Sequence, residues 1–222
     1  NQGRVSILLP GVMRDDPDYQ AISIMNDILG GGGFTSRIMN RVRSDEGLAY
    51  SAGSSFQGGV YFPQPFRASF QSKSRTVAYA TQIVLEEMKK IAEAPVTAEE
   101  LETSKKSYID TFPQHFTTKA QTAGTFAAEE FTGRFAKQPD FWKTWRGKVE
   151  AVTAADVQRV ARKHLHPDQV RILVVGQKEE VLKGHPNHDS DLKKLGSGRL
   201  VQVPLRDPLT MKPMEKKDPG VQ

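Results

Sequence analysis

Strand-like apolar segments stand at both ends of the patterned part of the chain, and mostly helical segments fill the stretch between them. Residues 3–12 (GRVSILLPGV) are rich in branched apolar side chains, which is typical of a β-strand. Residues 170–175 (VRILVV) form a continuous apolar run, which predicts a fully buried strand. Two further strand-like runs, 49–56 and 66–72, are joined through a segment rich in glycine and proline. These four segments predict the strands of one sheet.

Apolar residues at helical spacing predict the helices. The first helix carries Ile22, Met25, Ile28 and Leu29 on one face. The expected helical ranges are about 18–29, 35–45, 75–92, 97–113, 120–131, 141–149 and 153–165. N-caps are predicted at Asp18, at Thr97 in a capping box with Glu100, and at Thr153.

The order of these segments predicts an α+β fold, with helices packed on one face of a mostly antiparallel sheet. No internal repeat or linker divides the chain, so residues 1–203 are expected to form a single domain. The proline-rich and charged residues 204–222 are expected to be an extended or disordered tail. Because the chain opens with Asn-Gln-Gly-Arg and no leader precedes the first strand, we expect a fragment or a processed product.

Composition excludes several classes of site and partner. The chain has no cysteine, which excludes disulfides and thiolate metal ligands. Its net charge is +5, but basic and acidic residues are interspersed, so no nucleic-acid partner is expected. No apolar run reaches the roughly 18 residues of a membrane span.

Four consecutive glycines, residues 30–33, precede the second predicted helix. Glycine lets backbone N–H groups approach a phosphate, but the Gly-Lys-Ser/Thr of a phosphate-binding loop is replaced by Phe-Thr-Ser-Arg. A tight turn between helices that needs positive φ is the favoured interpretation.

Arg43 and Tyr50 are the candidate functional pair. A Glu-Gly-Leu turn separates the helix end that carries Arg43 from the strand that begins at Tyr50, so both could lie on one rim of the sheet. Together they supply several hydrogen-bond donors and no base, which suits gripping a peptide carbonyl or stabilising an oxyanion. A surface arginine and a half-buried tyrosine are the alternative.

Residues 29–51 (LGGGGFTSRIMNRVRSDEGLAYS) resemble the pitrilysin/insulinase family of zinc peptidases, which includes mitochondrial processing peptidase. The similarity extends over roughly residues 3–176 and marks the second, C-terminal domain of that family. The matching elements, in order, are Gly32-Gly33, Ser36-Arg37, Arg43 and Gly47-Leu48-Ala49-Tyr50.

The resemblance implies that this chain is one half of a clamshell that closes around a peptide. A catalytic domain, fused upstream or a separate subunit, would carry His-x-x-Glu-His and a distal glutamate, and would bind the zinc. Tyr50 would contact the scissile region and Arg43 the substrate backbone or Tyr50. Arg37 is grouped with the substrate-binding residues, although a structural role is favoured for it. A homo- or heterodimer, and a bacterial periplasm or cell-envelope location, are further expectations.

The chain departs from the family's catalytic motif. None of its five histidines lies in His-x-x-Glu-His, so it is expected to bind no metal and to be inactive alone. The segment 185–188 (His-Pro-Asn-His) is expected to be a polar loop, and the acid pairs Glu99-Glu100 and Glu129-Glu130 to be solvated helix faces. A stand-alone hydrolase is disfavoured because neither a Gly-x-Ser-x-Gly elbow nor a thiol is present. An inactive scaffold of the same fold remains the alternative, although Arg43 and Tyr50 argue against it.

Overall fold

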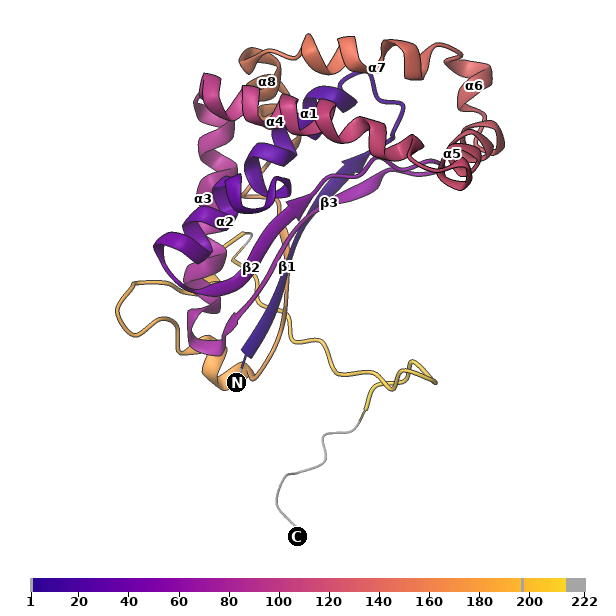
Figure 1. Ribbon diagram of the computed structural model, residues 1–222. Coiled ribbons are helices and arrows are strands. Elements are labelled where there is room, and N and C mark those ends of the chain that lie inside the picture. Colours follow the sequence, from indigo (N-terminus) through magenta and orange to yellow (C-terminus); the bar gives the residue numbers. More distant parts are fainter. Residues whose placement is uncertain (1, 197, 215–222) are drawn as a thin grey trace.

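The computed structural model describes residues 2–196 and 198–214, and within them a single antiparallel sheet of four strands in the order β2-β3-β1-β4 (Figure 1). The long β1 pairs with β3 on one side and with β4 on the other, and β2 forms a hairpin with β3. The strands are β1 (Gln2–Val12), β2 (Ala49–Ser55), β3 (Gln64–Lys73) and β4 (Arg171–Val175).

Helices gather over one face of this sheet, and the other face is open (Figure 1). The helices are α1 (Tyr19–Asn26), α2 (Arg37–Met39), α3 (Val77–Glu93), α4 (Ala98–Thr111), α5 (Lys119–Phe131), α6 (Arg134–Lys137), α7 (Phe141–Glu150), α8 (Ala154–His164) and α9 (Lys178–Leu182). The π-helical segments η1 (Asp27–Gly31) and η3 (Asn40–Asp45) extend α1 and α2, with the 3₁₀ turn η2 (Gly33–Thr35) between them.

The core lies between the helices and the covered face of the sheet. Along β1 the residues Val5, Ile7 and Leu9 are buried, whereas Ser6 and Leu8 between them are only partly buried, as the period of two of a half-covered strand requires. The expected apolar face of the first helix is buried as well: Ile22, Met25, Ile28 and Leu29. The predicted α+β class, with helices on one face of an antiparallel sheet, is confirmed.

The expectation that VRILVV is a fully buried strand is wrong. β4 is an edge strand, and its outward-facing Leu173 and Val175 are 52% and 56% exposed. Ile172 and Val174, on the opposite side of the strand, are partly buried against the core. An unbroken apolar run shows that the residues are apolar; it does not show that a second layer covers each face.

Two of the three predicted N-caps are confirmed. The hydroxyls of Thr97 and Thr153 accept hydrogen bonds in capping boxes at the starts of α4 and α8. Asp18 does not cap α1, because its carboxylate instead accepts hydrogen bonds from Arg159 and Lys163 of α8. These bonds lower the pKa of Asp18 to about 2, with Arg159 the largest cause.

The prediction that the acid pairs are solvated fails at two of the four positions. Glu129 is 6% exposed, and its carboxylate lies 3.1 Å from Nε of the equally buried Arg134. Arg134 also contacts Asp15 at 3.3 Å and stacks on the Phe141 ring. The pair thus joins α5 and α6 to the loop that follows β1. Glu100 is the second exception and contacts Arg37.

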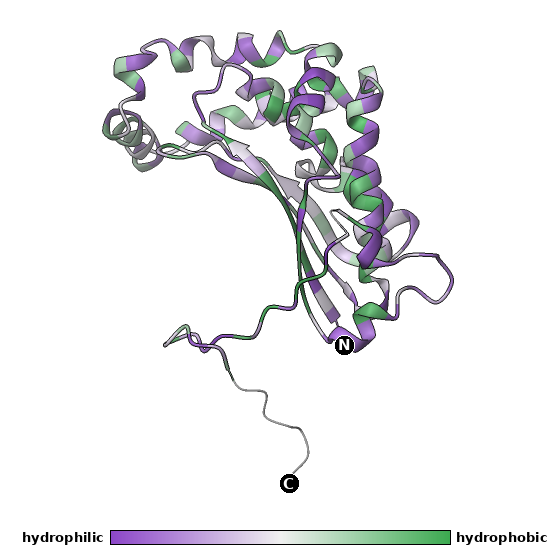
Figure 2. Ribbon diagram, turned by 180° about the vertical axis from the view of Figure 1, so that it is seen from behind, coloured by the Kyte–Doolittle hydropathy of each residue, from purple (hydrophilic) through white to green (hydrophobic). Residues whose placement is uncertain are grey.

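The segment after the η6 turn (Leu192–Lys194) runs away from the sheet (Figure 2). In its described part, the Asp207 carboxylate accepts hydrogen bonds from the backbone N–H groups of Leu209 and Thr210. An isolated antiparallel β-bridge joins the backbones of Arg206 and Pro213. Residues 215–222 of the predicted tail lie outside the described residues. Within residues 2–196 and 198–214, no helix is both long and apolar enough to cross a bilayer.

Candidate functional site at the β2 edge

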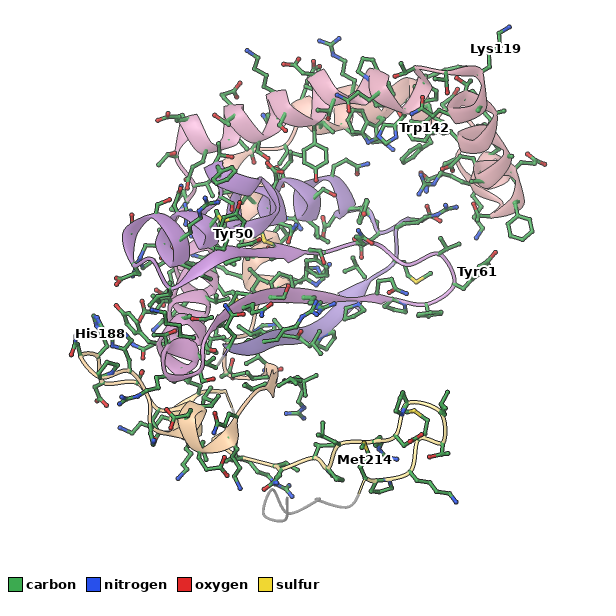
Figure 3. All side chains as sticks on the ribbon, turned by 60° about the horizontal axis from the view of Figure 1, so that its bottom comes forward. Tyr50, Tyr61, Lys119, Trp142, His188 and Met214 are labelled. Atoms are coloured by element: carbon green, nitrogen blue, oxygen red, sulfur yellow. The ribbon has the colours of Figure 1, made fainter. Side chains whose placement is uncertain are left out.

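A β-bulge at the start of β2 sets the direction of Tyr50. Ala49 pairs with Ser72 and Ala52 with Phe70, so β2 has one more residue than β3 over this stretch. Ala49 and Ala52 are buried, and the extra residue lets both Tyr50 and Ser51 face away from the core. The Tyr50 side chain is 83% exposed and lies on β2 beside the helical segments (Figure 3).

A short turn brings Arg43 next to this tyrosine. Arg43 lies in η3, and the chain turns through Gly47, whose φ of +61° suits glycine. The N–H of Gly47 donates to the Arg43 carbonyl, and the N–H of Leu48 donates to the Val42 carbonyl at 2.8 Å. The chain therefore enters β2 directly beside the end of the helix.

The guanidinium carbon of Arg43 lies 4.7 Å from the centroid of the Tyr50 ring. It lies at the same distance, 4.7 Å, from the ring of Phe34 in η2, which is 67% exposed. Within the described part of the chain, no side-chain hydrogen bond or ion pair involves Arg43, so these ring contacts are its defining interactions. The sequence motif pointed to Arg43 and Tyr50 but not to Phe34; an aromatic residue directly after the glycines was the available signal.

Arg37 is turned into an internal ion pair. Its Nε and one terminal nitrogen donate to the two carboxylate oxygens of Glu100, at 2.6 and 2.8 Å. These bonds hold the pKa of Glu100 below its ordinary value. Glu100 also accepts the backbone N–H of Thr97, so the pair fastens α2 to the start of α4. The guanidinium of Arg37 is thus engaged by the protein itself.

The glycine run serves close packing more than unusual backbone angles. Only Gly33 among the four has positive φ, +60°. A Cβ on Gly30 would lie 2.5 Å from Ser54 Oγ, and one on Gly53 would lie 2.7 Å from the Gly30 carbonyl oxygen. The end of η1 therefore crosses β2 at Gly53 and Ser54 with backbone almost against backbone.

The histidines contribute to packing in this structure. His185 and His188 lie with ring centroids 4.6 Å apart, and His188 stacks on Tyr79 at 4.0 Å. His164 lies edge-on to Phe56, and burial lowers its pKa. Across residues 2–196 and 198–214, no group of three or more histidine or acidic side chains is placed to hold a metal ion.

Two open clefts lie elsewhere on the molecule. One, of about 670 Å³, lies between the loop after β1 and α7, and the other, of about 610 Å³, lies beside the end of β1. Neither is lined by Arg43, Tyr50 or Arg37. The Arg43–Tyr50 pair therefore lies outside both clefts, with Tyr50 exposed at the start of β2.

Comparison with known proteins identifies the fold. Residues 1–108 match the family model of the peptidase M16 inactive domain. The crystal structure of a peptidase M16 inactive domain from Pseudomonas fluorescens superposes with a TM-score of 0.70 at 26% identity, over 78% of this chain and 40% of that one. The inactive peptidase domain from Bordetella parapertussis gives 0.63 at 16% identity, over 79% of this chain and 93% of that one.

A curated relative from Helicobacter pylori, "Non-peptidase homolog YmxG", is 24% identical over 165 residues, which are 73% of this chain and 37% of the relative. The chain thus spans well under half the length of this relative and of the Pseudomonas protein. The resemblance noted in the sequence is confirmed: residues 1–108 match the peptidase M16 inactive domain, and the fold is similar to solved inactive domains of that type.

Proposed function

We propose that this domain is the substrate-binding, non-zinc half of a clamshell zinc peptidase. It holds an extended peptide at the β2 edge, against a catalytic domain that bears His-x-x-Glu-His. Zinc bound by that domain supplies the Lewis acid and the activated water. The observation that carries the proposal is the contact of Arg43 with Tyr50, with the polar groups of both left free for a ligand.

The two side chains have separate tasks in this proposal. The Tyr50 hydroxyl donates a hydrogen bond to the carbonyl of the scissile peptide and to the oxyanion that develops from it. The guanidinium of Arg43 contacts the Tyr50 ring, limits its rotation, and donates to neighbouring substrate carbonyls. Neither residue generates a nucleophile, which is consistent with an inactive domain.

The test combines this chain with a catalytic domain that bears the zinc motif. Tyr50→Phe removes one hydroxyl and keeps the ring, so kcat should fall about tenfold or more while KM changes little. Tyr61→Phe is the matched control, because Tyr61 is 72% exposed at the far tip of the β2–β3 hairpin (Figure 3). Equal kcat in Tyr50→Phe and in the unaltered protein would remove Tyr50 from the mechanism.

A scaffold without peptide binding is the second candidate, and the relative named a non-peptidase homolog favours it. The two candidates differ in what the isolated chain binds. A scaffold leaves unstructured peptides unbound, and Tyr50→Phe and Arg43→Ala then change nothing in a peptide-binding assay. A substrate-binding domain binds such peptides weakly, and both substitutions reduce that binding.

The cellular location of this protein is proposed from one structural neighbour. A neighbour of the same fold, PqqL from Escherichia coli, is a periplasmic protease, at 16% identity and a TM-score of 0.63. We place this protein in the bacterial periplasm or cell envelope, paired with its catalytic domain in the same chain or as a separate subunit, and able to form a homo- or heterodimer. Fractionation of the native host, followed by co-purification on the tagged chain, tests both points.

A further inference from the structure

We propose that Phe34 is a positioning residue of the peptide site: its ring holds the Arg43 guanidinium in place beside Tyr50. The inference rests on the proposed function of Arg43 and Tyr50 and adds a third residue, from a separate turn, to their site. Phe34 lies nine positions before Arg43, on the other side of the buried start of α2.

The turn that carries Phe34 is held firmly. Gly33 takes the left-handed φ of +60°, and the residue after it, Phe34, is exposed. The hydroxyl of Ser36, which is fully buried, donates to the Gly33 carbonyl at 2.7 Å, and the Thr35 hydroxyl donates to the Gly32 carbonyl at 2.9 Å. These bonds close the turn around Phe34, so the position of its backbone is set by local geometry.

The exposure of Phe34 indicates that its ring packs against a neighbouring side chain and is not part of the core. Phe34 is 67% exposed, yet its ring centroid lies 4.7 Å from the guanidinium carbon of Arg43, as close as that of Tyr50. Arginine can stack on aromatic rings without using its N–H donors. Two ring contacts therefore restrict a long side chain and leave its donors free for a peptide.

An arginine held this way loses less freedom when a ligand binds. An acidic partner in place of the two rings would compete with the ligand for the guanidinium. Without any partner, the arginine side chain would populate several rotamers, and binding would have to order it. The arrangement predicts that loss of the Phe34 ring weakens peptide binding roughly two- to fivefold, although Phe34 itself donates no hydrogen bond.

The experiment uses the full chain in solution. The Nε–Hε resonance of Arg43, assigned by its disappearance in Arg43→Lys, reports ring-current shift and side-chain order. Phe34→Leu should move this resonance toward a random-coil position and weaken binding of an unstructured peptide, and Phe34→Tyr should restore both. Phe131→Leu removes a comparably exposed ring, 83% exposed on α5, and should change neither.

The possible outcomes separate this inference from the proposed function. An Arg43 resonance that is unchanged in Phe34→Leu overturns the positioning role, whatever the peptide does. Peptide binding that is indifferent to Arg43→Ala and Tyr50→Phe overturns the proposed function, even if the resonance moves as expected. A change in Phe131→Leu equal to that in Phe34→Leu would show a general effect of surface aromatics and would also overturn the inference.

Discussion

Arg37 and Glu100 lie 63 residues apart in the chain, yet two hydrogen bonds of 2.6 and 2.8 Å join them side to side. Arg37 precedes the buried residues of α2, and Glu100 completes the capping box of α4. One carboxylate therefore caps the start of α4 and also holds α2, the helix that continues into the segment carrying Arg43. This double use favours a structural role for Arg37.

Substitution of Arg37 tests that role. Arg37→Gln should lower the free energy of unfolding by about 1 kcal/mol, because the bidentate pair is partly shielded from water, at 19% and 25% side-chain exposure. Urea denaturation of Arg37→Gln, Glu100→Gln and the double variant gives the coupling energy between the two residues. Weaker peptide binding by Arg37→Gln with unchanged stability would instead assign Arg37 to the substrate.

Arg43→Lys separates charge from stacking. Lysine keeps the positive charge but lacks the planar group that lies against the rings of Phe34 and Tyr50. We expect peptide affinity, measured by fluorescence anisotropy, to fall about threefold to tenfold. Arg75→Lys, at an exposed position after β3, is the matched control and should bind as the unaltered chain does. Full affinity in Arg43→Lys would mean that charge alone is recognised.

The surroundings of Gly30 and Gly124 predict opposite effects when each is replaced by alanine. Gly30→Ala places a Cβ within 2.6 Å of Ser54 Oγ and N, so it should cost about 1–3 kcal/mol of unfolding free energy. Gly124→Ala in α5 meets no atom within 4 Å and should stabilise by about 0.5–1 kcal/mol, because alanine favours the helix. Thermal denaturation of both variants compares them. A Gly30→Ala variant as stable as the unaltered chain would contradict the close approach.

Acid should weaken the tie between the loop after β1 and α8. Because Arg159 and Lys163 lower the pKa of Asp18 from 3.8 to about 2, this carboxylate stabilises the folded state above pH 3.8, and the contribution is lost as pH falls from 3.8 toward 2. Asp18→Asn should therefore cost about 0.5–1 kcal/mol at pH 6. Its effect should shrink near pH 2. Asp110→Asn, on an exposed site of α4, should cost little at either pH. A constant difference for Asp18→Asn across this range would contradict the assignment.

Local patterns in the sequence were sufficient for the four strands, for the longer helices and for the caps at Thr97 and Thr153, but not for the short helices α6 and α9. These features depend on residues within one turn or one strand, where period and hydrogen-bonding capacity decide the outcome. The pairing of Arg43 with Tyr50 along one rim also follows from the short turn between them. Their task in peptide binding stays a prediction.

Features that depend on distant partners could not be read in this way. Asp18 resembles an N-cap until α8 brings Arg159 beside it, and Glu129 resembles a solvated residue until Arg134 folds over it. The apolar run of β4 resembles a central strand, although no second strand covers its outer edge within the described residues. In each case the decisive neighbour comes from another element.

The bulge at the start of β2 gives the strand two consecutive outward-facing residues, Tyr50 and Ser51, between the buried Ala49 and Ala52. Side chains alternate between the two sides of a regular strand, so removal of Ser51 would restore the ordinary alternation and leave Tyr50 outward. The tyrosine can therefore keep its direction in a shorter strand, and the bulge itself matters for the second exposed position beside it.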